Sequence, residues 1–356
     1  MMDGCVRAVI EAIHSSPTQV VVYLSGGASH VLGWLTSVPG ASNTLLEAVV
    51  PYSRMSSIQL LGKIPTHFTS QQTAEEMALL AYNRALKLSR PGAPVLGVGF
   101  TGSLATTRPK LGDHRFHVST RTSDRLWLSS VTLSKGFRTR EEEEIISSQF
   151  LLEAIASGCK VQAGFSPELS ETDVLVETER QFNEDEELSQ LLNGEICSKV
   201  YNFSSEAYPP NSERKTILPG SFNPLHDGHL KLLDVASSIC DGHPCFEISA
   251  VNADKPPLTI SQIKERVTQF EKIDTAVRLI NPKYYDGNYE KMIEILLRCK
   301  NTGCTFLVGG RNVDGIFKVL EDIDIPDVLK DMFISIPAEK FRMDISSTEI
   351  RKSHGI

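Results

Sequence analysis

A short strand that runs directly into a glycine-rich turn is the feature that most constrains how the second half of this chain can fold. Residues 216–218 are β-branched or apolar, the turn 219–221 follows at once, and a helical pattern covers 229–238. Strand, glycine turn and helix in direct succession predict an α/β unit. Further strand candidates, separated by helical segments, lie at 246–251, 305–308 and 333–336. This alternation predicts a Rossmann-like, doubly wound parallel sheet.

The first part of the chain predicts another α/β unit by the same reasoning. A β-branched run at 18–24 stops at the Ser-Gly-Gly turn of residues 25–27, after which helical spacing resumes. Further strands are expected at 94–100 and 124–133, and helices at 69–88 and 139–156. The last of these helices is expected to open with a capping box, since Thr139 is followed three residues later by Glu142.

Residues 166–212 interrupt this pattern. They lose regular apolar spacing and gain acidity, most of all at 183–187. A length of 356 residues also exceeds that of one ordinary domain. We therefore predict two α/β domains, 1–165 and 213–356, joined by an acidic linker at 166–212.

Composition excludes several classes of protein. A net charge of -8 argues against a general nucleic-acid binder, which presents a basic face. No window approaches 18 uninterrupted apolar residues, so no membrane span is expected. The start of the chain lacks a basic-then-apolar leader, so no secretion signal is expected. The seven cysteines form no CxxC pair, which predicts reduced thiols in a cytoplasmic protein and neither a zinc site nor a disulfide framework.

The turn after the strand at 216–218 is suited to hold phosphate. Gly220 and Ser221 bring backbone N–H groups close to an anion, because glycine allows a close approach. His226 and His229 are three residues apart where the helix begins, a spacing that puts both imidazoles on one face. Gly228 between them keeps that face open.

A second anion-binding element is predicted near the C-terminus. Ser346 and Glu349 form a capping-box pattern, which predicts a helix N-terminus with free N–H groups and partial positive charge. Arg351 adds a permanent forked cation about one turn into this helix.

Together these motifs resemble a known family. Residues 220–229 read GSFNPLHDGH and residues 345–351 read ISSTEIR. Both match the cytidylyltransferase-like superfamily of nucleotidyltransferases with an HxGH motif, most closely the nicotinamide mononucleotide adenylyltransferases. The resemblance implies ATP and Mg²⁺, a mononucleotide acceptor and a role in NAD biosynthesis, with His226, His229 and Arg351 as catalytic residues. It implies nucleotide contacts from Gly220, Ser221, Phe222, Asn223, Gly228, Ser346, Ser347 and Thr348, with no residue assigned as a metal ligand. Lys255 is a weaker candidate.

One departure from this family bears on activity. No strand candidate stands between 246–251 and 305–308, and the helix from Ile260 passes straight into 273–279. Asp274 and Thr275 look like the tail of a turn whose strand is gone. We therefore expect a domain that lacks one strand. If the strand is missing, the alternative to an active adenylyltransferase is a nucleotide-binding protein with impaired transfer or weak ATP hydrolysis.

The first domain resembles the C-terminal domain of the competence-damage protein, a family that includes nicotinamide mononucleotide deamidases. The resemblance rests on LTSVPGAS at 35–42 and on the order of shorter strings around it. Where these deamidases place a nucleophilic serine and a lysine, this chain has Tyr23 and Ser57. Ser25 is a possible substitute nucleophile or a turn-capping residue. We expect lost deamidase chemistry, with amidohydrolase activity as the alternative, and a homo-oligomer or mononucleotide contact through this domain.

Overall fold

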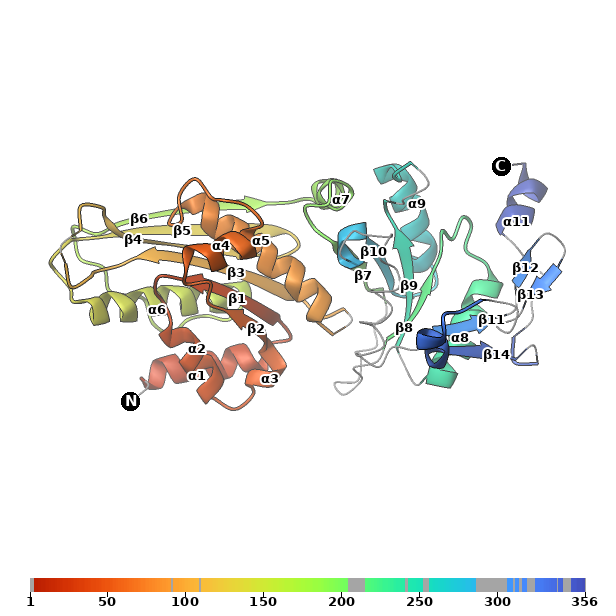
Figure 1. Cartoon of the computed structure of the whole chain (residues 1–356), viewed down its shortest axis with the longest axis horizontal. Coiled ribbons are helices and arrows are strands. Elements are labelled where there is room, and N and C mark those ends of the chain that lie inside the picture. Colours follow the sequence, from red (N-terminus) through yellow and green to blue (C-terminus); the bar gives the residue numbers. More distant parts are fainter. Residues whose placement is uncertain are drawn as a thin grey trace. The chain divides into compact units, whose positions relative to one another are not determined.

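The computed structural model describes residues 3–90, 92–108, 110–203, 215–240, 243–251, 256–285, 306–309, 311–313, 316–318, 324–337, 339–341 and 347–355. The chain splits into two compact units, Met1–Glu187 and Leu188–Ile356. Both are built from helices and sheets that contain parallel strands, which confirms the predicted α/β class (Figure 1). Among the described residues, no helix is both long enough and apolar enough to cross a membrane.

The first unit is built on a six-stranded sheet of order β2-β1-β3-β4-β5-β6. Its strands are β1 (Gln19–Ser25), β2 (Leu45–Val49), β3 (Val95–Ser103), β4 (His114–Arg121), β5 (Arg125–Leu133) and β6 (Val174–Gln181). The first three run parallel, and the remaining three are antiparallel to their neighbours. The helices are α1 (Gly4–Ser15), α2 (His30–Ser37), α3 (Ala41–Thr44), α4 (Arg54–Leu61), α5 (Gln71–Leu88) and α6 (Arg140–Gly158).

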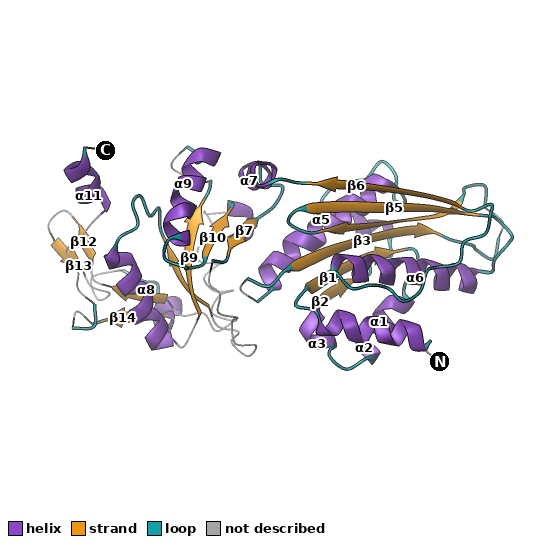
Figure 2. Cartoon of the chain, turned by 180° about the vertical axis from the view of Figure 1, so that it is seen from behind, coloured by secondary structure: helices purple, strands orange, loops and turns teal. Residues whose placement is uncertain are grey.

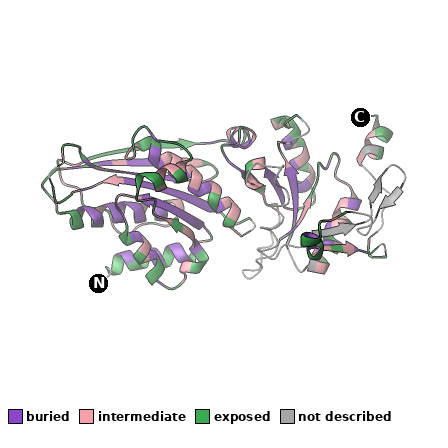
Figure 3. Ribbon diagram, in the orientation of Figure 1, coloured by how far each residue is buried: buried purple, intermediate pink, exposed green. Residues whose placement is uncertain are grey.

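Strand β3 explains how α5 packs on this sheet. A Cβ on Gly97 would stand 2.2 Å from the backbone nitrogen of Tyr82, and one on Gly99 would stand 2.2 Å from the carbonyl oxygen of Ala74. Glycine at these positions therefore lets the helix backbone lie directly on the strand. The alternate residues of β3, among them Leu96 and Phe100, belong to the buried apolar cluster that residues of α1, α2 and α6 complete. Buried residues are coloured purple in Figure 3.

The domain boundary differs from the predicted one. The expected linker at 166–212 contains β6, which pairs along its length with β5 and so belongs to the first unit. It also contains α7 (Glu184–Leu192) and β7 (Ser198–Tyr201), and β7 joins the sheet of the second unit. All residues of β6 are exposed, so this edge strand shows none of the apolar alternation by which half-buried strands are recognised.

The second unit is built on a four-stranded sheet of order β7-β10-β9-β8. Strands β8 (Lys215–Pro219), β9 (His243–Ser249) and β10 (Val277–Ile280) run parallel, and β7 is antiparallel to β10. Helices α8 (Asp227–Cys240) and α9 (Ile260–Glu271) connect these strands. The remaining elements that the structure describes are the parallel pair β11 (Phe306–Gly309) and β14 (Phe333–Ile336), the antiparallel pair β12 (Arg311–Val313) and β13 (Ile316–Lys318), the 3-10 helices η1 (Pro282–Tyr285) and η4 (Asp327–Met332), and α11 (Ser347–His354) (Figure 2).

Strand β10 corrects the expectation of a missing strand. It is fully buried and pairs with both β9 and β7, so the sheet continues where the sequence indicated a gap. The strand was not predicted because its central residue is Arg278, and a charged residue is not expected inside a run of buried residues. Its guanidinium donates hydrogen bonds to Glu247 of β9 and to the hydroxyl of Tyr284, the latter at 2.8 Å. Asp274 has a left-handed φ of 49° and forms the turn that leads from α9 into this strand.

Candidate nucleotide site

The turn after β8 is shaped by Gly220 and Phe222. The Gly220 N–H donates to the carbonyl oxygen of Glu247 at 2.9 Å, which continues the pairing with β9 past the end of β8. Phe222 is buried and has a left-handed φ of 42°. A Cβ on Gly220 would stand 2.6 Å from Cζ of the Phe222 ring, so only glycine fits beneath it. A strained, buried turn of this kind is typical of functional sites.

The Phe222 ring connects this turn to the core of the second unit. It meets His229 edge-on with ring centroids 5.0 Å apart, and it meets Phe246 of β9 and Phe270 of α9 edge-on at 5.1 and 5.6 Å. Edge-to-face geometry is the favoured arrangement of aromatic rings. The ring therefore fixes the position of His229 relative to the sheet and to α9.

The two histidines predicted to contact phosphate lie against each other. Their rings stack with centroids 3.7 Å apart and an interplanar angle of 22°. The His229 N–H donates to the carbonyl oxygen of His226 at 2.9 Å, and the His226 N–H donates to Nδ1 of His229 at 3.3 Å. The expected common face of the two imidazoles at the start of α8 is therefore present.

Burial favours the neutral form of both rings. It lowers the pKa of His229 to about 4, with His226 adding to the effect. Burial also lowers the pKa of His226, against the opposing charge of Asp227. Because Nδ1 of neutral His229 accepts a hydrogen bond, its proton lies on Nε2 and is available to a ligand. Nδ1 of His226 is buried and has no hydrogen-bond partner among the described residues.

The C-terminal motif reaches the same loop. Ser347 at the start of α11 donates from Oγ to the carbonyl oxygen of Pro224 at 2.9 Å. The guanidinium of Arg351 donates to the carbonyl oxygen of Asn223. Two segments far apart in the sequence thus meet. The positive N-terminal end of a helix is attached to residues 220–229, which we call the histidine loop. Ser346, with its predicted capping box, lies outside the described residues, as does Lys255, and only the helical backbone of Thr348 is described.

Two side chains of α9 complete this arrangement, and sequence analysis did not identify them. Gln269 accepts the Leu225 N–H on Oε1 at 2.8 Å and donates from Nε2 to the carbonyl oxygen of Phe222 at 3.5 Å. Arg266 lies one turn earlier on the helix. Burial lowers its pKa, as does the nearby charge of Arg351, whereas Glu265 acts in the opposite direction. Their spacing of three residues was the available signal, since it puts both on one helix face.

The first unit has Tyr23 and Ser57 where the deamidases that it resembles in sequence place a nucleophilic serine and a lysine. Tyr23 is buried on β1, and burial together with the carboxylate of Glu47 raises its pKa to about 12. Ser57 and Ser25 both donate to the carbonyl oxygen of Pro51, at 2.8 and 3.2 Å. A tyrosine this hard to deprotonate is a poor nucleophile.

The family comparison agrees with the geometry of the second unit. Residues 217–353 match the family described as cytidylyltransferase-like. This segment is a cytidylyltransferase-like domain. It places the second unit in the nucleotidyltransferase class of enzymes and covers the histidine loop together with α9 and the C-terminal helix.

Three solved structures that are similar to part of the chain are competence-damage proteins. The competence/damage inducible protein CihA from Agrobacterium tumefaciens is 20% identical, with a TM-score of 0.36, and the match covers 44% of this chain and 98% of that protein. A competence-damaged protein (CinA) superfamily member from Enterobacter cloacae is 14% identical, with a TM-score of 0.34 and coverage of 42% and 85%. One from Escherichia coli is 13% identical, with a TM-score of 0.28 and coverage of 44% and 88%. A search of curated proteins gave no match.

Proposed function

We propose that the cytidylyltransferase-like domain transfers the adenylyl group of ATP to a mononucleotide such as nicotinamide mononucleotide. The observation that carries this proposal is the meeting of the stacked His226 and His229 with the Arg351 end of α11 on one loop. Hydrogen-bond donors and fixed cations gathered at one point favour a ligand with several phosphates.

The transfer needs stabilised charge more than it needs a nucleophile on the protein. An oxygen of the acceptor's phosphate attacks the α-phosphorus of ATP, and the bond from this phosphorus to the oxygen bridging toward the β-phosphorus breaks. That oxygen leaves as part of pyrophosphate. Donors aimed at the phosphoryl oxygens lower the barrier, because negative charge shifts onto these oxygens and the leaving group.

Each named side chain has a place in this step. Nε2–H of His229 and the His226 ring donate to phosphoryl oxygens, and an anion beside these rings raises their pKa and favours their protonation. Arg351 and Arg266 carry positive charge close to each other, and an anion between two such cations relieves their repulsion. Gln269 positions the loop through the Leu225 N–H.

Mg²⁺ is expected to be carried by the nucleotide. No group of three or more His, Cys, Asp or Glu side chains that could hold a metal occurs within the described part of the chain. Mg²⁺ commonly keeps several waters and binds substrate phosphates with one or two protein carboxylates. The donor-rich loop fits phosphate oxygens, so the ion would neutralise phosphate charge on ATP itself.

The alternatives now have less support. Impaired transfer was expected from a missing strand, and β10 fills that position in the sheet. Amidohydrolase activity in the first unit would need a nucleophile other than Tyr23, whose pKa is raised to about 12 by burial and Glu47. The adenylyltransferase is therefore the function that we carry forward.

The test uses the purified full chain with MgATP and nicotinamide mononucleotide, and measures the dinucleotide and pyrophosphate formed. The same assay with CTP in place of ATP tests which nucleotide base the enzyme prefers in the triphosphate. We expect His226→Ala and His229→Ala each to lower kcat by about a hundredfold, the usual effect of removing one transition-state donor. His30→Ala changes an exposed histidine of the first unit and serves as the control.

Two results would count against the proposal. Absence of product with every nucleotide and acceptor pair would refute transfer. Wild-type rates in both histidine variants would refute the assignment of the phosphate site.

A further inference from the structure

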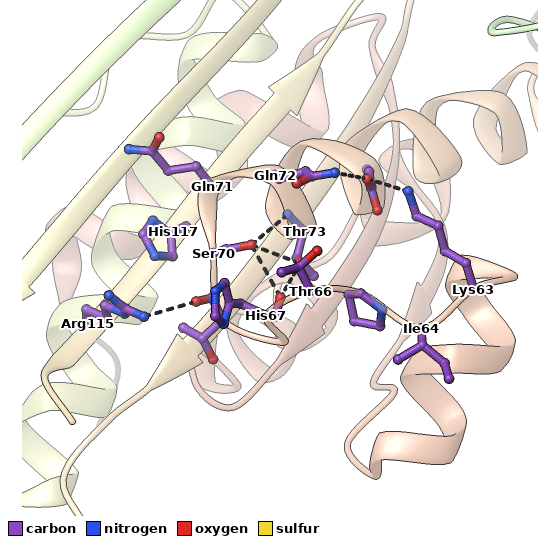
Figure 4. A pocket seen from close by; sticks show the side chains of 13 residues that line it. Lys63, Ile64, Thr66, His67, Ser70, Gln71, Gln72, Thr73, Arg115 and His117 are labelled. Atoms are coloured by element: carbon purple, nitrogen blue, oxygen red, sulfur yellow. Dashed lines mark hydrogen bonds and ion pairs between the residues drawn. The ribbon is translucent and has the colours of Figure 1, made fainter. Parts of the chain in front are cut away.

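A pocket of about 600 Å³ lies in the first unit at the N-terminal end of α5. Its wall is formed by residues of the segment 63–73 other than Phe68, by Glu76 of α5, and by Arg115 and His117 of β4 (Figure 4). Neither Tyr23 nor Ser57 lines it, so it is separate from the deamidase positions. Its volume lies within the range of small-molecule sites, which run from about 300 to 1,000 Å³.

The His117 side chain presents an unsatisfied hydrogen-bond donor at this pocket. The residue is 8% exposed, and its Nδ1 lies 2.8 Å from Oγ of Ser130. Gln71 donates from Nε2 to that same oxygen at 3.0 Å, and a hydroxyl oxygen can accept this bond while it donates its own proton elsewhere. We assign the Ser130 hydroxyl proton to the bond with Nδ1, which puts the proton of the neutral ring on Nε2. This buried Nε2 has no hydrogen-bond partner among the described residues, so the ring lacks an acceptor.

The neighbouring groups are donors and cations as well. Arg115 makes one long hydrogen bond of 3.5 Å from Nη2 to the carbonyl oxygen of Thr69. The α5 helix has 18 residues, and the side-chain oxygen of its N-cap Ser70 accepts the Thr73 N–H. The N–H groups of the first helical residues have no partner inside a helix, and they add partial positive charge.

The one carboxylate that lines this pocket is neutralised. Glu76 accepts from Nζ of Lys63 at 2.7 Å and from Nε2 of Gln72 at 2.9 Å. Arg115 therefore contributes a positive charge that no carboxylate of the pocket wall balances. A site that offers an unsatisfied N–H, a guanidinium and a helix N-terminus calls for a ligand with several acceptor oxygens and negative charge.

We propose that this pocket binds the phosphate group of a small phosphorylated metabolite. The phosphate accepts hydrogen bonds from Nε2 of His117 and from the α5 N-terminus, and it pairs with Arg115. The rest of the pocket holds the organic part of the ligand. This site belongs to the first unit and does not depend on the transferase proposed for the second.

The experiment follows the His117 Nε2–H signal by nitrogen-15 NMR in the full chain, assigned by its loss in His117→Gln. The probes are inorganic phosphate and ribose 5-phosphate, with ribose and acetate as the uncharged and carboxylate comparisons. Because the signal belongs to His117, phosphate bound at residues 220–229 does not move it. We expect saturable shifts with both phosphates, none with ribose, and weaker binding of acetate.

Variants of the two cations test the pocket further. Arg115→Gln is expected to weaken phosphate binding at least tenfold. Lys63→Gln leaves the carboxylate of Glu76 without its cation and is therefore expected to weaken phosphate binding severalfold. Because the Lys63 side chain is exposed, this variant keeps the test valid if Arg115→Gln fails to fold. Arg7→Gln removes an exposed arginine of α1 as a matched control. A His117 signal that phosphate leaves unmoved, or wild-type binding in both pocket variants, would overturn the proposal.

Discussion

The guanidinium of Arg351 donates a hydrogen bond to the backbone carbonyl oxygen of Asn223, 128 positions earlier in the chain. The neighbouring carbonyl of Pro224 accepts from Ser347, so two consecutive carbonyls of the histidine loop hold the start of α11. Arginine carries five N–H donors in one planar fork, so a single guanidinium can hold a carbonyl oxygen and a phosphate together. We propose that Arg351 has both a structural and a ligand-binding role.

Replacement of Arg351 by lysine separates these roles. A lysine keeps the charge but has no fork with which to hold a carbonyl and a phosphate together. We expect Arg351→Lys to raise KM for ATP about tenfold and to lower kcat, measured as pyrophosphate release with nicotinamide mononucleotide. Lys352→Gln removes the exposed cation next along the helix and is expected to behave as wild type. Equal kinetics in Arg351→Lys and wild type would contradict the assigned role.

Gln269 is predicted to act on the loop without touching the substrate. Gln269→Ala removes the acceptor of the Leu225 N–H, and we expect kcat/KM to fall about fivefold, consistent with the loss of one hydrogen bond worth about 1 kcal/mol. Gln269→Glu keeps an oxygen acceptor at the same place and is expected to retain most of the activity. If alanine and glutamate have the same effect, Gln269 does not work through this bond.

Sequence patterns predicted the elements whose signals are local. The capping box of Thr139 and Glu142 opens α6 as expected, and α5 and β14 lie where their periodicity placed them. Strand β10 was missed because Arg278 becomes compatible with burial only after Glu247 and two tyrosines surround it. The contacts that stabilise the buried charge of Arg278 are tertiary, so the local spacing of residues in the sequence does not reveal them.

In the candidate site, too, the parts with local sequence signals were predicted and the parts that depend on tertiary contacts were not. The histidine loop and the C-terminal helix carry motifs, so sequence analysis found both. Gln269 and Arg266 became visible only once α9 was seen to pack beside the loop, since an ordinary amphipathic helix contains many such residues on its polar face. The His117 pocket likewise joins β4 to the start of α5, two elements that are separated in the sequence.

The buried pair of Glu247 and Arg278 should dominate the electrostatic stability of the second unit. Removing one partner of a buried pair leaves an uncompensated charge, so we expect Glu247→Ala to destabilise by about 3 to 5 kcal/mol. The exposed pair of Asp327 and Lys330 is the control, and Asp327→Ala is expected to change stability by less than about 1 kcal/mol.

The free energy of unfolding of both variants is measured by urea unfolding, followed by far-UV circular dichroism. Both tryptophans, Trp34 and Trp127, lie in the first unit, so their fluorescence reports that unit separately. For Glu247→Ala we expect the unfolding transition seen by circular dichroism to show a loss of stability, whereas the transition seen by tryptophan fluorescence stays as in wild type. Equal stability of the two variants would show that Arg278 is adequately solvated without its partner.

His117 predicts how the stability of the first unit depends on pH. Burial, aided by Arg115, lowers the pKa of His117 from 6.5 to about 4. Between these two values the unfolded chain binds a proton that the folded chain does not. The contribution of neutral His117 is therefore fully present above pH 6.5, and the free energy of unfolding falls as pH falls from 6.5 toward 4.

Glutamine does not titrate, so we expect the stability of the His117→Gln variant to depend less on pH than that of the wild type. This holds whatever the stability of the variant is at pH 7. Urea unfolding followed by tryptophan fluorescence at pH 7.5, 6.0 and 5.0 measures the slope, in buffer free of phosphate and sulfate so that no anion occupies the pocket. His67→Gln changes an exposed histidine at the same pocket and is expected to keep the wild-type slope. Parallel pH profiles for wild type and His117→Gln would mean that the ring is already protonated, or well solvated, in the folded chain. Its Nε2–H would then no longer be the unsatisfied donor of a neutral ring on which the proposed phosphate contact depends.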